Sequence, residues 1–94
     1  MAAYLIGHIT VKDPERWKKY VEGVGRSLPP YGGALLFRGK KNAVLAGKHP
    51  HELMVAIRFP DQSNLQSWFR SETYQALIPL RDQAADVVIV AYDG

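Results

Sequence analysis

His8 is the residue near the start of the chain whose side chain is best suited to acid–base chemistry. An imidazole titrates near neutral pH and can act as a general acid or a general base. The sequence identifies no carboxylate or nucleophile as the partner of His8. The favoured interpretation is a partly buried histidine satisfied by a neighbour or by the partner in a dimer, and His8 is the candidate for a catalytic residue if the chain has one.

His49 and His51 are separated by one proline, a spacing at which two side chains of a loop can bind one metal ion. A metal site needs a third and usually a fourth ligand, and Glu52 is the only obvious neighbour. The 94 residues include no cysteine, which excludes thiolate ligands, disulfides and cysteine nucleophiles. We therefore interpret the pair as an exposed turn and expect no metal site.

Two arginines are candidates for binding a carboxylate or a phosphate, because a guanidinium can hold either group through two parallel hydrogen bonds. Arg38 precedes Gly39 at the expected end of a strand, where a ligand could approach the backbone. Arg81 or Arg38 could instead pair with a local acid or with the carbonyls at a helix C-terminus. Arg38 is the better candidate of the two.

Four aromatic residues lie on helix faces that are expected to turn toward a sheet: Trp17, Tyr20, Trp68 and Tyr74. Trp17 is best explained as part of a core, where truncating a tryptophan costs about 3–5 kcal/mol. Trp68 and Tyr74 fit equally well in a core or in the wall of an apolar pocket, whose polar groups would be His8, Tyr74 or Arg81. The candidate ligand-binding residues are therefore Arg38, Trp68, Tyr74 and Arg81.

The sequence lacks the motifs of the common cofactor enzymes. It has no phosphate loop, no dinucleotide-binding glycine pattern, no Gly-x-Ser-x-Gly turn and no His-Glu-x-x-His motif. We expect no cofactor.

The net charge of +3 is mild, and the basic residues are expected along one amphipathic helix and at a turn. A nucleic-acid-binding surface would gather them on one face together with aromatic residues, so we expect no nucleic-acid partner. The N-terminal residues resemble no signal peptide, and no apolar stretch approaches the length of a membrane span. We expect no membrane association and a cytoplasmic location.

The elements that must position these residues can be read from apolar spacing. Asp13, Pro14 and Glu15 together are typical of a helix start, because they supply a cap, a suitable first residue and a favourable charge. An apolar stripe at a spacing of three and four continues this helix until two prolines stop it. The strands expected in this part of the chain are 3–11, 34–38, a short hairpin partner at 43–46, and 52–59.

A second helical region is expected after Pro60 and Asp61, and Ser71 is positioned to cap a new helix within it. Pro79 should break or kink this region into short segments. Residues 86–92 are nearly all apolar, which predicts a strand buried on both faces.

This order of elements predicts one α+β domain over residues 1–94 of the ferredoxin-like kind, an antiparallel sheet with helices on one face. The opposite face is rich in valine, isoleucine and leucine, which a chain this short cannot shield from water. We therefore expect a homodimer formed through the sheet face.

The chain resembles the domain-of-unknown-function family 1330 of the dimeric α/β-barrel superfamily over almost its full length. The resemblance rests on the order and spacing of these signals: Asp13-Pro14, Tyr20, Tyr31-Gly32-Gly33, Arg38-Gly39, Phe59-Pro60, Trp68, Ser71, Tyr74-Gln75-Ala76-Leu77 and Pro79-Leu80-Arg81. It implies a ferredoxin-like protomer that pairs through its sheet, and it implies no particular activity. Superfamily relatives include cofactor-free oxygenases and haem-degrading enzymes. The latter use a histidine on the later helix, and residues 72–85 contain none.

Two functional hypotheses follow. In the first, a homodimer binds or transforms a small organic molecule, without a cofactor, in a pocket between sheet and helices. In the second, the chain is a non-catalytic structural or interaction module whose aromatic residues fill a solid core. The first predicts a cavity near Trp68 and Tyr74 that His8 or Arg38 reaches, and the second predicts none.

Overall fold

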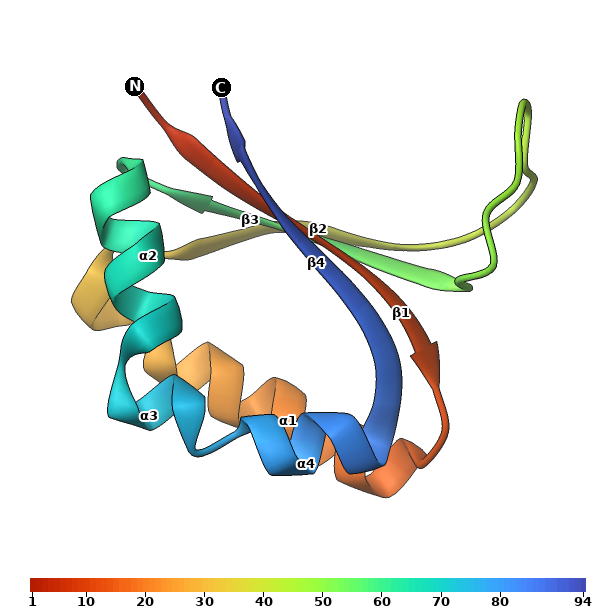
Figure 1. Cartoon of the computed structure of the whole chain (residues 1–94), viewed down its shortest axis with the longest axis horizontal. Helices are drawn as coiled ribbons and strands as arrows, with labels where there is room; N and C mark the ends of the chain where they lie inside the picture. Colours follow the sequence, from red (N-terminus) through yellow and green to blue (C-terminus); the bar gives the residue numbers. More distant parts are fainter.

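Four antiparallel strands form one sheet, and all the helices lie on one side of it (Figure 1). The computed structural model describes residues 1–94. Its elements in chain order are β1 (Ala3–Val11), α1 (Pro14–Ser27), the 3-10 turn η1 (Pro29–Tyr31), β2 (Ala34–Lys40), β3 (Leu53–Phe59), α2 (Gln62–Arg70), α3 (Glu72–Gln75), α4 (Ile78–Ala84) and β4 (Ala85–Asp93).

The strand order is β2-β3-β1-β4, so the first and last strands of the chain are neighbours. The two termini consequently lie close together, and Gly94 N–H donates to the carbonyl of Ala2. This topology confirms the predicted ferredoxin-like α+β fold. No helix is long and apolar enough to span a bilayer.

Helix α1 begins and ends as its sequence predicts. Asp13 precedes the helix, and its carboxylate accepts hydrogen bonds from the backbone N–H and the guanidinium of Arg16. After the helix, Pro29 opens the short turn η1, which ends at Gly32 with φ of 70°. A side chain at Gly32 would be strained by this backbone and would meet Pro60 at 2.8 Å.

The second helical region is divided into three short helices. Asp61 caps α2 by accepting from Asn64 N–H, and Ser71 caps α3 by accepting from Tyr74 N–H. Pro79 lies in the first turn of α4, where its missing N–H costs no hydrogen bond. The expected interruption near this proline is confirmed.

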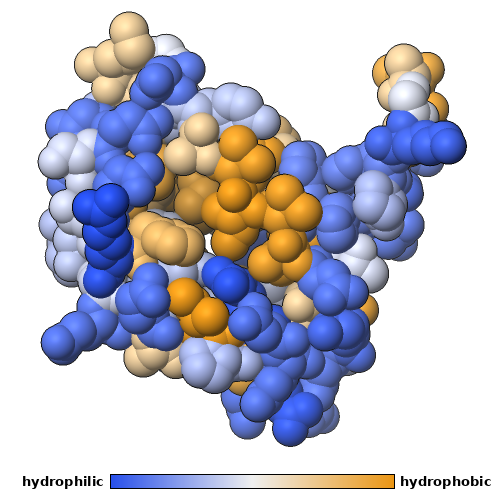
Figure 2. Space-filling view, viewed as in Figure 1, coloured by the Kyte–Doolittle hydropathy of each residue, from blue (hydrophilic) through white to orange (hydrophobic).

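The predicted short strand at residues 43–46 is wrong. Residues 41–52 form a loop that projects from the ends of β2 and β3 (Figure 1). Lys41 N–H donates to the carbonyl of Glu52 and the two side chains form an ion pair, which closes the base of the loop. Beyond that base the apolar residues have nothing to pack on, and Leu45 is 96% exposed, so no strand forms. Figure 2 shows the projection with a hydrophilic stem and an apolar tip.

The two faces of the sheet differ in their environment. Alternation along β1 directs Leu5 and Ile9 toward the helices, where both are buried. The prediction that β4 is buried on both faces is not met within one chain. On its outward face Val88 is 47% exposed and Tyr92 49% exposed.

The core is packed most tightly beneath α2 and α3. Its largest fully buried side chains are Phe59, Trp68 and Tyr74. The ring centroid of Trp68 lies 5.5 Å from that of Phe59 and 4.3 Å from that of Tyr74. The indole Nε1 of Trp68 donates to Ser27 Oγ at 2.8 Å, so the polar atom of this residue is satisfied as well.

Candidate functional site

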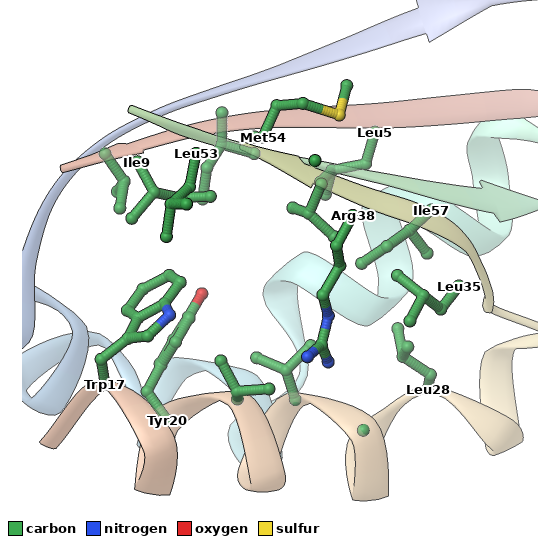
Figure 3. Close-up of a pocket in the computed structure, with 18 of the residues that line it drawn as sticks. Leu5, Ile9, Trp17, Tyr20, Leu28, Leu35, Arg38, Leu53, Met54 and Ile57 are labelled. Atoms are coloured by element: carbon green, nitrogen blue, oxygen red, sulfur yellow. The ribbon is translucent and has the colours of Figure 1, made fainter. Parts of the chain in front are cut away.

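An apolar cavity of about 390 Å³ lies between α1 and the inner face of the sheet (Figure 3). Of its 20 lining residues, 15 are hydrophobic, so most of the wall offers only apolar contacts. Residues of all four strands and of α1, together with Trp68 of α2, contribute to the wall. Its size and composition are those of a small-molecule site.

The hollow exists because α1 stands away from the sheet. The backbone of α2 approaches β1 and β3 closely, whereas α1 packs mainly against α3 and α4. The residues that α1 and the sheet contribute here include short ones, among them Gly7, Val24, Gly25 and Val55. A Cβ atom at Gly25 would meet no atom within 4 Å, which confirms that this part of the space is open.

Arg38 reaches into the cavity from β2 because of a β-bulge. The register with β3 shifts between Leu35 and Phe37, so that Leu35 pairs with Ile57 and Arg38 with Val55. Leu35 and Arg38 therefore share the inner face although they are three positions apart. Figure 3 shows the Arg38 side chain extending from β2 toward α1.

The guanidinium of Arg38 has no carboxylate partner in the chain. The ion pairs of the structure involve Lys12, Arg16, Lys41 and Arg81. Lys40, which also lines the cavity and is also without such a partner, adds a second positive charge on the same strand. The charged groups in the cavity wall are thus both cationic.

Tyr20 rises from α1 beside Trp17, and both line the cavity (Figure 3). Their rings are stacked with centroids 5.1 Å apart. Burial, together with the neighbouring Tyr74, raises the pKa of Tyr20 well above its usual range. The Tyr20 hydroxyl therefore stays protonated at neutral pH.

The four candidate ligand-binding residues are only partly brought together. Arg38 and Trp68 line the cavity. Tyr74 lies behind the wall, fully buried, with its hydroxyl 2.8 Å from that of Tyr20. Arg81 donates to the Tyr74 hydroxyl at 3.1 Å and borders a second, smaller hollow of about 230 Å³ next to β4. In Figure 2 apolar side chains gather around the middle of the face between sheet and helices.

His8 lies on the opposite face of the sheet from the cavity. Gly7 and Ile9, its neighbours in β1, line the cavity, and alternation turns His8 outward. There its ring packs edge-on against His49 at 4.6 Å, and its Nδ1 is buried without a hydrogen-bond partner. Burial, and then the nearby His49 and His51, lower the pKa of His8.

His49 and His51 belong to the base of the projecting loop. His51 Nδ1 and Thr10 Oγ1 are hydrogen-bonded at 2.9 Å, and the rings of His49 and His51 are 5.8 Å apart. No group of three or more histidine or acidic side chains is arranged to hold a metal ion. The pair anchors the loop to β1 rather than forming an isolated exposed turn.

Sequence reasoning missed Tyr20 and Lys40 as parts of the site. Tyr20 was assigned only to an aromatic set, although its position on the apolar stripe of α1 placed it over the sheet. Lys40 follows Arg38 by two positions, a spacing that places both on one face of a strand. That spacing was the available signal for a paired cationic site.

Several solved structures share this fold. That of RPA0582, a protein of unknown function from Rhodopseudomonas palustris, is similar with a TM-score of 0.84 and 13% identity, over 99% of this chain and 82% of that one. A DABB family protein with a ferredoxin-like fold from Mesorhizobium loti has a TM-score of 0.72 and 12% identity, over 99% and 96%. A dimeric ferredoxin-like protein of unknown function from Jannaschia sp. has a TM-score of 0.70 and 12% identity, over 100% of both chains. The likeness defines the class, a ferredoxin-like α+β protein.

The sequence then gives the family within this class. The model of the domain of unknown function DUF1330 matches residues 2–94, and the chain belongs to that family. The predicted resemblance is confirmed. No curated protein matches the chain.

Proposed function

We propose that the protein binds a small, largely apolar organic acid, without a cofactor, in the cavity between α1 and the sheet. The observation that carries the proposal is the unpaired guanidinium of Arg38 at an apolar cavity of about 390 Å³. A solid core would not leave this open space. The alternative hypothesis, a structural module with a solid core, fits the buried aromatic side chains at α2 but does not account for the cavity under α1.

The apolar wall supplies affinity for the body of the ligand. Burying about 150 Å² of apolar ligand surface contributes roughly 4 kcal/mol before the costs of association are subtracted. A ring or a short alkyl chain would displace water that the apolar side chains bind poorly. The preferred ligand is therefore apolar over most of its length.

Arg38 supports the acidic group of the ligand. A carboxylate can accept two parallel hydrogen bonds from the guanidinium, and Lys40 on the same strand adds to the positive potential. The geometry favours binding over catalysis by His8, because that imidazole is separated from the cavity by the sheet itself.

We infer that two copies of the chain associate through the outward face of the sheet. Strand pairing places Ile6 beside Val90 on one side and Ala56 on the other, and Ala56 beside Phe37, so apolar residues continue across all four strands. Phe37 is 55% exposed and Val90 36% exposed in the single chain, so the two edges of this apolar band face solvent. A similar solved protein is described as dimeric, which supports a second copy as the occupant of this face.

Light scattering at micromolar concentration tests the association. We expect a mass of about twice 10.5 kDa for the native protein, and a return to 10.5 kDa when a charge is placed on this face by Val90→Lys. A native mass of 10.5 kDa would overturn the dimer and leave the ligand proposal standing.

Calorimetric titration with phenylbutyrate tests the ligand proposal. We expect saturable binding of this acid, and binding about tenfold weaker for phenylbutanol, which has the same body without the charge. Arg38→Gln should weaken phenylbutyrate by a similar factor. Arg58→Gln is the matched control, because Arg58 is exposed on the neighbouring strand β3 and does not line the cavity. The proposal fails if phenylbutyrate does not bind, or if Arg38→Gln binds it as the native protein does.

A further inference from the structure

Three side chains from different helices form a hydrogen-bonded chain that ends at the cavity. Arg81 of α4 donates from Nη1 to the hydroxyl of Tyr74 in α3 at 3.1 Å. The hydroxyls of Tyr74 and Tyr20 are 2.8 Å apart. Tyr20, in α1, lines the cavity, whereas Tyr74 does not. The chain thus links a guanidinium outside the cavity to a phenol in its wall.

The direction of the hydrogen bonds follows from the chemistry of the groups. A guanidinium can only donate, so the Tyr74 oxygen accepts from Arg81. Tyr74 is 0% exposed, and its hydroxyl has no partners other than Arg81 and Tyr20. Its proton is satisfied only if it is donated to Tyr20, because the alternative leaves a buried donor without an acceptor.

The Tyr20 proton is then free to point into the cavity. The Tyr20 oxygen already accepts from Tyr74, and no other hydrogen bond of the Tyr20 hydroxyl occurs in the structure. The raised pKa of Tyr20 keeps this proton in place at neutral pH. Arg81 stays charged, since hydrogen bonds to Tyr74 and Asp82 outweigh the effect of burial and raise its pKa. The positive charge at one end polarises the chain toward stronger donation at the other.

We propose that Tyr20 is a ligand-binding residue that donates a hydrogen bond to an oxygen atom within the apolar body of the ligand. This inference rests on the proposed function and narrows the ligand class. The ligand would carry an acidic group for Arg38 and, separately, a carbonyl or other acceptor oxygen for Tyr20. Tyr74 and Arg81 are positioning residues, because they fix the direction of the Tyr20 proton without lining the cavity.

The same hydrogen-bond directions disfavour ligands that present a hydrogen-bond donor, or only apolar atoms, to the Tyr20 hydroxyl. A ligand that presents a donor to Tyr20 finds an oxygen that already accepts from Tyr74 and a proton directed at it. An apolar ligand leaves that proton unsatisfied, which costs binding free energy. The cavity should therefore discriminate between an oxo acid and the corresponding acid that has a methylene group at the same place.

The matched ligands benzoylpropionate and phenylbutyrate test this discrimination, because the first has a ketone where the second has a methylene. We expect the native protein to bind benzoylpropionate about three- to tenfold more tightly in calorimetric titrations. Tyr20→Phe should abolish this preference, and phenylbutyrate should bind at least as tightly as before, because no proton is then left without an acceptor. Tyr31→Phe is the control, because Tyr31 does not line the cavity and its hydroxyl forms no hydrogen bond within the chain.

A positioning role of Tyr74 can be distinguished from a structural one by comparing the affinities for the two acids. Tyr74→Phe should reduce the preference for the ketone, because the Tyr20 proton is no longer held toward the cavity, and should leave the affinity for phenylbutyrate unchanged. A purely structural role would weaken both acids together. That outcome would contradict the assignment of Tyr74.

The outcomes separate this inference from the proposal on which it rests. Equal affinities of the native protein for the two acids overturn the role of Tyr20 and leave the organic-acid site intact. Failure of both acids to bind overturns the site itself. If Tyr20→Phe does not fold, the carbonyl stretch of bound benzoylpropionate decides: a shift to lower frequency than in an apolar solvent is expected, and an unshifted band contradicts the hydrogen bond.

Discussion

The inner face of the sheet supports two regions built in opposite ways. At α2 and α3, the large side chains of Phe59, Trp68 and Tyr74 are fully buried in one core cluster. Under α1, short valine side chains and glycines without any side chain leave a cavity of about 390 Å³. The packed region and the hollow region share the same strands, so the difference lies in side-chain size and in the distance of each helix from the sheet.

The comparison separates the residues that hold the fold from those that are available to a ligand. In the packed region the large side chains are almost entirely buried, so removing one of them leaves a costly void. In the hollow region part of each side chain already faces open space, so changes of size are tolerated. The amphipathic pattern of α1 predicts that a face is apolar, but not whether that face is filled.

The largest contrast is expected from truncation. Trp68→Ala should lower the free energy of unfolding by about 3–5 kcal/mol, because it removes a large side chain that is only 1% exposed and leaves Ser27 without its donor. Val24→Ala, in the wall of the hollow region, should cost less than about 1.5 kcal/mol. Urea denaturation of both variants measures the contrast. Similar losses would mean that the two regions are packed alike.

Replacing a small residue by a larger one tests the same contrast in the opposite direction. Ala3→Phe forces a ring into a position of the buried core cluster that is 0% exposed, and should destabilise the fold by about 1–3 kcal/mol or more. Val24→Phe adds a ring to the wall of the open cavity, so stability should change by less than about 1 kcal/mol. Phenylbutyrate affinity should fall at least tenfold in Val24→Phe, because the ring occupies the site. Unchanged affinity would place the ligand elsewhere.

The two faces of β1 should respond differently to pH. The pKa of His8 is lowered from 6.5 in the folded chain, so the unfolded chain binds the proton first. The contribution of His8 to stability is complete above pH 6.5 and is lost as the pH falls through the lowered pKa. His8→Gln should flatten this decline in urea titrations at several pH values.

Phenylbutyrate affinity should not follow that titration, because His8 faces away from the cavity. An affinity that changes with the protonation of His8, and no longer changes in His8→Gln, would show that the two faces are coupled. It would also restore His8 as a functional residue.

The smallest expected effect comes from two glycines of α1. Alanine should gain about 0.5–1 kcal/mol of helix propensity at either position. At Gly25 the new Cβ meets no atom within 4 Å, so Gly25→Ala should raise the melting temperature. At Gly23 it lies 2.7 Å from Leu77, so Gly23→Ala should lower the melting temperature. Equal shifts would mean that Leu77 moves aside without cost.

Local signals in the sequence were sufficient for most of the fold. The Asp13, Asp61 and Ser71 caps and the prolines marked helix ends, because capping depends only on residues a few positions away. The strand expected at 43–46 failed because its apolar residues had no surface to pack on, and a tertiary surface is not encoded locally. The apolar outward face was predicted from the sequence, and in the single chain Val88 and Tyr92 on that face are about half exposed.

The site was harder to predict, because it depends on geometry between elements. The bulge before Phe37 turns Arg38 to the inner face, and no residue type near it signals this shift. The Tyr20–Tyr74 contact joins helices 54 positions apart, so spacing could not reveal it. Trp68 was left open between core and pocket, and the structure places it at the boundary of the two regions.

Methyl NMR during a titration with phenylbutyrate tests the central claim most directly, because it reports each region separately. We predict saturable shifts of the cavity methyl groups of Val21, Val24 and Val55, with Leu65 of the packed region and Val88 of the outward face unchanged. Shifts confined to Val88, or no shifts in the cavity at a concentration that saturates the protein by calorimetry, would contradict the account.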